Sequence, residues 1–173
     1  ALAARRLDGM RVVELGCGLG LPSVVALARG AEVLATDWYE EALEFARANA
    51  RSAIGRDLAT LVVDWRFPPA DLVDQAPFDL VVAADVLYET RNAEALAGLL
   101  PHLVAEGGEV WIADPRRPDA RHLWDALEPA GWVRETRDVR LEGPVDEAGP
   151  VVHLHRLRPP GTPEPSGSHG RVR

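Results

Sequence analysis

Short apolar runs rich in β-branched residues alternate with helical segments, and this alternation constrains the fold more than any other feature of the chain. The runs that predict strands are Met10–Leu15, Glu32–Thr36, Thr60–Val63, Phe78–Ala84 and Glu109–Ala113. The intervening segments that predict helices are Leu19–Arg29, Trp38–Ser52, Asn92–Val104 and Asp119–Glu128. Apolar strands separated by helices are typical of a parallel sheet covered on both faces.

The C-terminal part follows a different pattern. Trp132–Leu141 and Val151–Leu157 alternate apolar and polar residues, which predicts an antiparallel pair. The whole pattern therefore predicts an α/β fold, a doubly wound, Rossmann-like, mostly parallel sheet with a C-terminal antiparallel hairpin. We expect one domain over residues 1–158, beginning at the end of a helix. Residues 159–173 hold four Pro and three Gly and predict a disordered tail.

The composition limits the class of protein. The chain has 173 residues, 47% of them hydrophobic, which fits one soluble domain with a sizeable core. A net charge of −8 disfavours nucleic acid as the main partner. No apolar run approaches the roughly 20 residues of a membrane span, no signal peptide opens the chain, and a single cysteine excludes an internal disulfide. We expect a cytoplasmic monomer that binds neither a membrane nor nucleic acid.

Doubly wound sheets bind ligands beyond the carboxyl ends of their strands. The first loop at that edge, Glu14–Gly20, carries glycine at positions 16, 18 and 20 and leads into a helix. Glycines let a ligand approach the backbone, and a helix N-terminus suits an anion. The dinucleotide fingerprint needs a further glycine at position 21, which is Leu21 here. An acid followed by G-x-G-x-G is instead typical of S-adenosylmethionine (SAM) binders.

Acidic and aromatic residues follow the next two strands. Asp37 lies 19 residues after Gly18, where an acid accepts the ribose hydroxyls of a nucleoside. Asp64 and Trp65 end the third strand, where an acid reads an adenine amino group and an indole covers the ring. The simpler alternatives are that Asp37 caps the following helix and that Trp65 only closes the edge of the core.

The fourth strand gives the most informative loop. Phe78–Ala84 runs directly into Asp85, and Tyr88 follows three residues later. This spacing predicts a carboxylate and a phenol together at the mouth of the cofactor cleft. Alternatively, Asp85 caps the following turn and Tyr88 packs against the core.

These motifs together resemble those of the seven-β-strand, SAM-dependent methyltransferases and, within them, the family 16 lysine methyltransferase-like group. The resemblance covers residues 12–90 and rests on Val13–Gly20, Thr36-Asp37, Asp64-Trp65 and Ala84–Tyr88. The Asp-x-x-Tyr element after the fourth strand separates this group from other methyltransferases. Family members usually carry a further segment ahead of the glycine loop, so we expect this chain to be a minimal member or a fragment.

The resemblance implies a SAM cofactor, with S-adenosylhomocysteine as its product, and it implies a role for each matching position. Gly16 and Gly18 would pack against the methionine portion, and Asp37 would hold the ribose. Asp85 and Tyr88 would be the catalytic residues that shape the acceptor channel. The implied cofactor contacts are Glu14, Gly16, Cys17, Gly18, Gly20, Asp37, Trp38, Asp64, Trp65, Ala84 and Asp85.

The resemblance also implies the reaction, which is methyl transfer to the side-chain amine of a protein lysine. Such an amine has an unperturbed pKa of about 10.4 and must lose its proton before it attacks. A narrow, partly dry channel lowers that pKa. We expect Asp85 to accept a hydrogen bond from the amine and Tyr88 to form the channel wall.

Other functions remain open. A small-molecule N- or O-methyltransferase has the same fold, because fold does not fix the acceptor. A SAM-binding module without turnover would bind the cofactor only. A nicotinamide-dependent oxidoreductase is disfavoured by Leu21. It is also disfavoured because all 19 basic residues are arginine, so no lysine is present for a Tyr-Lys catalytic pair.

Three further features have simpler interpretations. Cys17 fits a tight turn as a small residue. His153 and His155 share one face of a strand, but no third metal ligand is evident, so we expect an exposed pair on an edge strand and no metal site. Arg116 and Arg117 follow the fifth strand, where they face an acidic substrate patch, the SAM carboxylate or only solvent.

Overall fold

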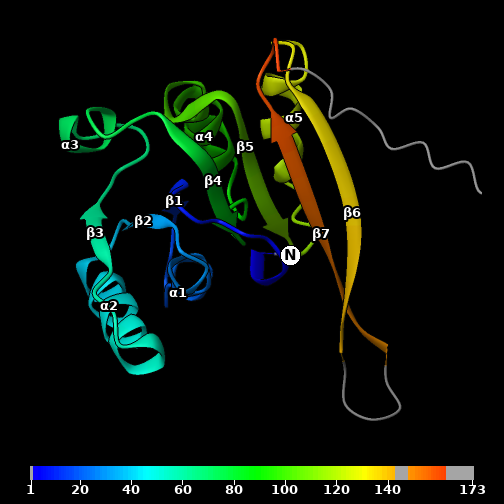
Figure 1. Ribbon diagram of the computed structural model, residues 1–173. Coiled ribbons are helices and arrows are strands. Elements are labelled where there is room, and N and C mark those ends of the chain that lie inside the picture. The colour runs from blue at the N-terminus through cyan, green and yellow to red at the C-terminus, as the bar shows by residue number, and fades with distance from the viewer. Residues whose placement is uncertain (1, 143–147, 163–173) are drawn as a thin grey trace, which may run out of the picture.

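The computed structural model describes residues 2–142 and 148–162, and Figure 1 shows how their elements are arranged. A short 3-10 helix, η1 (Leu2–Ala4), precedes the first strand. The strands are β1 (Arg11–Leu15), β2 (Glu32–Asp37), β3 (Ala59–Val62), β4 (Phe78–Ala84), β5 (Val104–Asp114), β6 (Val133–Glu142) and β7 (Ala148–Arg158). The helices are α1 (Leu21–Ala28), α2 (Glu40–Ile54), α3 (Ala70–Val73), α4 (Thr90–Leu103) and α5 (Ala120–Leu127).

The strands form one seven-stranded sheet with the order β3-β2-β1-β4-β5-β7-β6. Strands β1 to β5 pair in parallel, whereas β7 runs antiparallel to both β5 and β6. The predicted doubly wound sheet with a C-terminal antiparallel hairpin is therefore confirmed. The winding reverses between β1 and β4, so the carboxyl ends of these two strands flank the switch point at which such sheets bind ligands.

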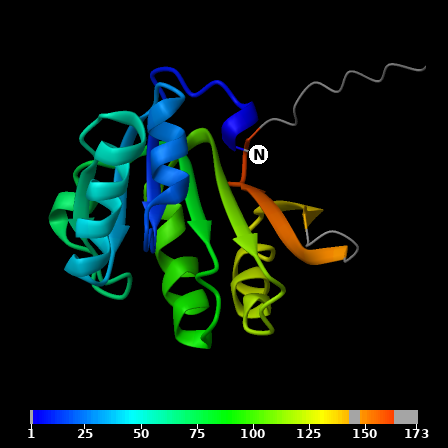
Figure 2. The ribbon, with the colours of Figure 1, turned by 90° about the horizontal axis from the view of Figure 1, so that it is seen from below.

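Helices cover both faces of the sheet. Figures 1 and 2 show α1 and α2 on one face and α4 and α5 on the other. Successive strand residues point to opposite faces. Accordingly, Val12 belongs to the apolar cluster that includes Ala26 of α1 and Ala46 of α2, whereas Val13 belongs to the cluster that includes Leu100 of α4. Alternate side chains of β1 thus pack against the helical layers on the two faces of the sheet.

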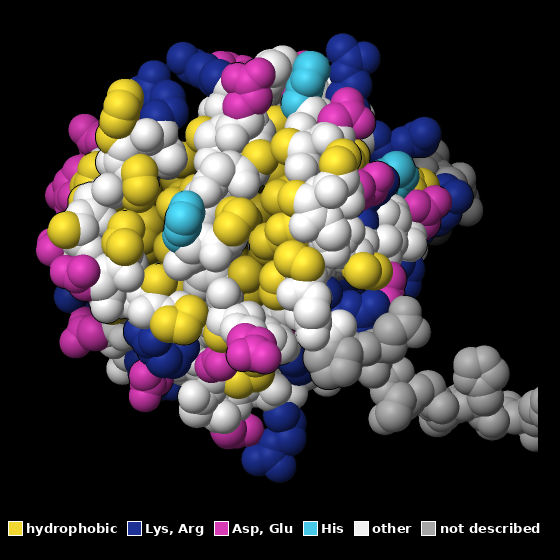
Figure 3. Space-filling model, turned by 90° about the horizontal axis from the view of Figure 1, so that it is seen from above, with side chains coloured by type: hydrophobic (Ala, Val, Ile, Leu, Met, Phe, Trp, Pro, Cys, Tyr) yellow, Lys and Arg dark blue, Asp and Glu magenta, His cyan; other side chains and the backbone are white. Residues whose placement is uncertain are grey.

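The face covered by α4 and α5 is viewed in Figure 3. Hydrophobic side chains gather in its middle, and most charged side chains lie around its rim. Among the described helices, none combines the length and the apolar character that crossing a membrane requires.

Two local predictions differ from the structure. The fifth strand was predicted over Glu109–Ala113, but β5 starts earlier, at Val104, directly after α4 ends at Leu103. Gly107 and Gly108 therefore lie within β5, where the register against β4 shifts between Phe78 and Leu80. The short helix α3 was not predicted, because four residues carry too little periodicity. Most of the predicted tail, residues 163–173, lies outside the described residues.

Candidate active site

The glycine loop between β1 and α1 forms one wall of the candidate site. Gly16, Gly18 and Gly20 have φ angles of 68°, 51° and 73°, in the left-handed region that favours glycine. A Cβ on Gly16 would lie 3.0 Å from Val86 Cγ1, and one on Gly20 would lie 2.7 Å from Ala46 Cβ. A Cβ on Gly18 would meet no described atom within 4 Å. Gly16 and Gly20 are therefore needed for packing, whereas the backbone at Gly18 is open to a ligand.

Asp37, the last residue of β2, reaches this loop. Its Oδ2 accepts a hydrogen bond from the Gly18 backbone N–H at 2.9 Å, and its Oδ1 accepts one from the Tyr39 N–H at 3.0 Å. The structure therefore joins the two sequence motifs that were predicted to bind the methionine portion and the ribose of one cofactor. The carboxylate is only partly buried and stands at the open part of the loop.

Glu14 lies behind the loop, and its side chain is buried. Its Oε2 accepts hydrogen bonds from the Ser23 backbone N–H at 2.8 Å and from the Ser23 hydroxyl at 2.5 Å. Burial raises the pKa of Glu14 to about 7, although the bonds to Ser23 oppose the shift. Glu14 thus ties the first turn of α1 to β1, and its predicted contact with the cofactor stays a prediction.

Cys17 is buried within the loop, and its backbone N–H donates to the Thr36 carbonyl at 2.8 Å. Burial raises the pKa of the thiol to about 12, with Glu14 and Asp37 adding to the shift. The thiol therefore stays protonated at neutral pH and has little reactivity.

Asp64, beyond the end of β3, forms an ion pair with Arg66, whose Nη2 lies 2.8 Å from Asp64 Oδ2. This partner lowers the pKa of Asp64. The Arg66 guanidinium also lies 5.2 Å from the centroid of the Trp38 ring and 5.8 Å from that of Phe67. Both aromatic rings are exposed. The predicted cofactor residues Trp38 and Asp64 therefore meet through Arg66 at the edge of the site.

Trp65 packs against the core and against the glycine loop. A Cβ on Gly16 would lie 3.2 Å from its indole ring. Its Nε1 is buried and has no hydrogen-bond partner among the described residues. Trp65 therefore closes the edge of the core, as in the simpler interpretation, and it also leaves an unmet hydrogen-bond donor beside the loop.

Asp85 follows Ala84 at the mouth of the site and has a φ of 54°, unusual for a residue other than glycine. Its backbone N–H donates to the Ala113 carbonyl at 2.8 Å, which fixes it to the end of β5. Its carboxylate accepts two hydrogen bonds from Arg117, from Nε at 2.7 Å and from Nη2 at 2.8 Å. Tyr88 is exposed on the same loop.

The Asp85 pairing was missed from the sequence. Arg117 had been expected to face a substrate, the SAM carboxylate or solvent, but it faces Asp85 of the same chain. The signal available was only that an acid and a base follow neighbouring strands. Which side chains meet across that edge depends on loop conformation, and Arg116, with a φ of 71°, turns the loop.

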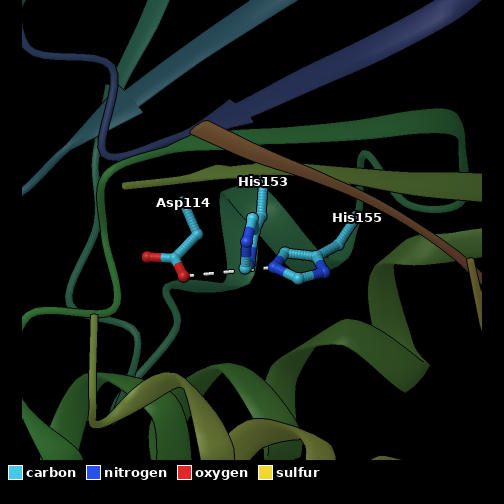
Figure 4. Close-up of side chains that lie close together, drawn as sticks. All are labelled: Asp114, His153 and His155. Atoms are coloured by element: carbon cyan, nitrogen blue, oxygen red, sulfur yellow. Dashed lines mark ion pairs between the residues drawn. The ribbon is translucent and has the colours of Figure 1, made fainter. Parts of the chain in front are cut away.

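The interpretation of His153 and His155 as an exposed pair on an edge strand is wrong. Strand β7 lies between β5 and β6, and His155 is only 2% exposed. The structure also brings a third residue, Asp114, to the pair, as Figure 4 shows. The strand order was the missing information, because the alternating pattern of β6 and β7 does not show which of them pairs with β5.

A comparison with protein families identifies the chain. The profile of the lysine methyltransferase family matches residues 2–127. The chain belongs to the lysine methyltransferase family. Protein N-lysine methyltransferase METTL21A of Danio rerio is 42% identical over 100 residues, which are 56% of this chain and 45% of that protein. The chain spans about half the length of the curated relatives that it matches.

Solved methyltransferases share the fold of this lysine methyltransferase family member. Precorrin-6y C5,15-methyltransferase of Geobacter metallireducens GS-15 superposes with a TM-score of 0.70 at 15% identity, over 91% of this chain and 85% of that chain. Magnesium protoporphyrin IX methyltransferase of Synechocystis PCC 6803, with bound SAM, gives a TM-score of 0.68 at 21% identity, over 91% and 74% of the two chains. The fold is that of the class I SAM-dependent methyltransferases.

The residues of the site fit SAM. The open backbone at Gly18 leaves room for the methionine portion, and the Asp37 carboxylate beside it suits the ribose hydroxyls. The buried, unpartnered Nε1 of Trp65 offers a hydrogen-bond donor beside the same loop. The candidate site therefore presents complementary groups for the methionine portion and the ribose of SAM.

Proposed function

We propose that this chain is a SAM-dependent methyltransferase that transfers a methyl group to the side-chain amine of a protein lysine. One observation carries the proposal beyond the family. The Asp85 carboxylate at the mouth of the site holds a guanidinium through two hydrogen bonds of 2.7 and 2.8 Å. This carboxylate is thus positioned to bind a cationic nitrogen, and a lysine side chain arrives as an ammonium ion. The similarity to the N-lysine methyltransferase METTL21A of Danio rerio supports this choice of acceptor.

Cofactor binding falls to the loops after β1, β2 and β3. Asp37 holds the ribose, the backbone at Gly18 passes close to the methionine portion, and Trp65 lies at the adenine side. When bound, SAM supplies the electrophilic methyl group. The chain's contribution is alignment, and well-oriented reactants gain about 7–11 kcal/mol in this way.

Acceptor binding falls to the loop after β4. Asp85 receives the ammonium group in place of Arg117, and the proton leaves to solvent as the amine enters the drier part of the channel. Asp85 then accepts a hydrogen bond from the neutral amine and directs its lone pair toward the methyl group. Tyr88, exposed on the same loop, forms the outer wall of this channel.

The test is a transfer assay with labelled SAM and a lysine-rich protein lysate, followed by hydrolysis of the protein and identification of the labelled amino acid. The chain contains no lysine side chain, so methyl-lysine in the hydrolysate comes from the substrate. Label in methyl-lysine, lowered at least tenfold in Asp85→Asn and retained in Asp57→Asn, supports the proposal. Label in another amino acid or in small molecules only contradicts it.

A small-molecule acceptor is the second candidate, and an apolar pocket favours it. The pocket has a volume of about 280 Å³ and is lined by Leu21 and Pro22 of α1 together with Ala84 and Trp111 of the sheet. Ala84 belongs to both the pocket and the predicted cofactor site. In the same assay, label that is soluble in acid and partitions into organic solvent selects this candidate.

The proposal includes a cellular compartment, an oligomeric state and a class of substrate. We propose that the protein acts as a monomer in the cytoplasm, and its net charge of −8 favours a basic protein substrate over nucleic acid.

A further inference from the structure

We propose that Asp114, His153 and His155 bind one divalent transition-metal ion, with Zn²⁺ as the best-fitting ion. Asp114 is the last residue of β5, and the two histidines lie on β7, which pairs with it. Asp114 is the register partner of His153, so all three side chains emerge on one face of the sheet. This site lies beside the proposed acceptor site and does not depend on the proposed function.

The geometry brings one ligand atom of each residue within 4.8 Å of the other two. His155 Nε2 lies 4.0 Å from Asp114 Oδ2, which is too far for a hydrogen bond. Figure 4 shows the carboxylate and the imidazole turned toward each other, with His153 beside them. Tetrahedral zinc with bonds of about 2.0–2.2 Å separates its ligands by about 3.4 Å, so binding requires the ligand atoms to move together by up to about 1.4 Å.

The state of His155 points to a ligand. Its Nε2 is buried and has no hydrogen-bond partner among the described residues. A buried polar nitrogen without a partner calls for an explanation such as an ion. The residue is only 2% exposed, so bulk water does not satisfy this nitrogen.

A second set of contacts holds His155 in place. The Thr136 hydroxyl lies 2.9 Å from Nδ1, and the ring of Trp124 lies 4.6 Å away between centroids. When Nδ1–H donates to Thr136, the lone pair of Nε2 is directed into the cluster. Metal-binding histidines have a partner of this kind on the second ring nitrogen.

The charges around the cluster suit a cation. A neutral imidazole with a free lone pair is the form of histidine that ligates a metal ion. Asp138 of β6 adds a carboxylate, with Oδ1 3.4 Å from His153 Nε2. The Arg134 guanidinium lies over the Trp124 ring, which is beside His155. Its pairing with Glu128 offsets part of its charge.

The donor set selects the class of ion. Two imidazole nitrogens and one carboxylate oxygen match Zn²⁺ or a neighbouring transition metal, whereas Mg²⁺ and Ca²⁺ prefer oxygen ligands only. The His153 side chain is 26% exposed and provides the path for the ion. Water completes the fourth position.

Binding has a consequence for the neighbouring loop. Asp114 also accepts hydrogen bonds from the Arg117 backbone N–H at 3.0 and 3.2 Å. A carboxylate that is both metal-bound and hydrogen-bonded fixes this turn, and Arg117 is the residue that holds Asp85. The ion therefore stiffens the segment that presents Arg117.

The test is titration of the metal-stripped full chain with Zn²⁺ by calorimetry and with Co²⁺ by visible absorption. We expect one equivalent to bind, with the strong absorption of tetrahedral Co²⁺ and an increase in Tm. His153→Ala and Asp114→Asn should each weaken Zn²⁺ binding at least tenfold. His153 is partly exposed, so its variant tests the site without emptying the core, and circular dichroism verifies its fold.

His122→Ala is the matched control, because His122 Nε2 also lies 4.0 Å from an aspartate oxygen, that of Asp119, but belongs to no cluster of three among the described residues. The His122→Ala variant should bind Zn²⁺ as tightly as the parent protein does. The proposal is overturned if the parent binds no stoichiometric metal, if folded His153→Ala binds as the parent does, or if His122→Ala loses binding equally.

Discussion

Arg117 holds Asp85 through two parallel hydrogen bonds, with Nε 2.7 Å from Oδ1 and Nη2 2.8 Å from Oδ2. The pair joins the loop after β4 to the loop after β5 at the mouth of the candidate site. Pairing with Asp85 raises the pKa of Arg117, so the guanidinium stays charged. In this structure Arg117 thus binds the Asp85 carboxylate. The proposed function requires that same carboxylate to bind the incoming ammonium group of the substrate.

Asp85→Asn should lower turnover at saturating SAM by about 10- to 100-fold, because a charge-assisted hydrogen bond contributes about 1.5–3 kcal/mol. Binding of S-adenosylhomocysteine should change little, since Asp85 lies at the acceptor side. Single-turnover assays with labelled SAM measure the first effect and calorimetry the second. Full turnover in the variant would show that Asp85 has no role in orienting the amine.

Arg117→Gln should lower the KM for the protein substrate by about two- to fivefold, because it removes the cation that competes for Asp85, and an ion pair at this exposed position is weak. Arg116→Gln is the control, since Arg116 is exposed and neighbours Arg117 in the chain. Steady-state kinetics at saturating SAM measure the effect. A higher KM in Arg117→Gln would mean that Arg117 itself contacts the substrate.

Most of the fold was predictable from the sequence because its cause is local. Each buried parallel strand is a nearly continuous apolar run, as in Phe78–Ala84, where five residues are buried in the structure. The start of β5 was not predictable, because Gly107 and Gly108 interrupt its apolar pattern where its register against β4 shifts. Such a shift depends on pairing with β4, which no local pattern records.

The candidate site was predictable to the same extent. Asp37 meets Gly18 as its position at the end of β2 predicts, because parallel strands end at one edge of the sheet. Two contacts were not predictable: the pairing of Asp85 with Arg117 and the position of Asp114 beside His155. The first depends on the conformation of the loops after β4 and β5, and the second on the order β5-β7-β6, which is a property of the whole sheet.

Asp37→Asn should weaken binding of S-adenosylhomocysteine at least tenfold, because an amide replaces a charged acceptor of the ribose hydroxyls. Calorimetric titration measures the change. Asp57→Asn is the control, since the Asp57 carboxylate is exposed and pairs only with Arg51 among the described residues. NADH should bind neither protein. Equal binding of S-adenosylhomocysteine by parent and Asp37→Asn would place the ribose elsewhere.

Glu14 should make the protein less stable as the pH rises. Burial raises its pKa from 4.5 to about 7, so the folded protein holds the proton more tightly than the unfolded chain. The stabilising contribution is therefore complete below pH 4.5 and is lost as the pH rises through 7. In Glu14→Gln this loss is absent, and the amide oxygen still accepts the hydrogen bonds of Ser23.

Urea denaturation of parent and Glu14→Gln at pH 5 and pH 8 measures the effect. The free energy of unfolding of the variant, relative to the parent, should rise by about 2 kcal/mol over this interval. All other titrating groups are common to both proteins, so the comparison isolates Glu14. Glu32→Gln, at an exposed position at the start of β2, should show no such change. A constant difference between parent and Glu14→Gln would mean that Glu14 is already ionised at pH 5 in the folded protein.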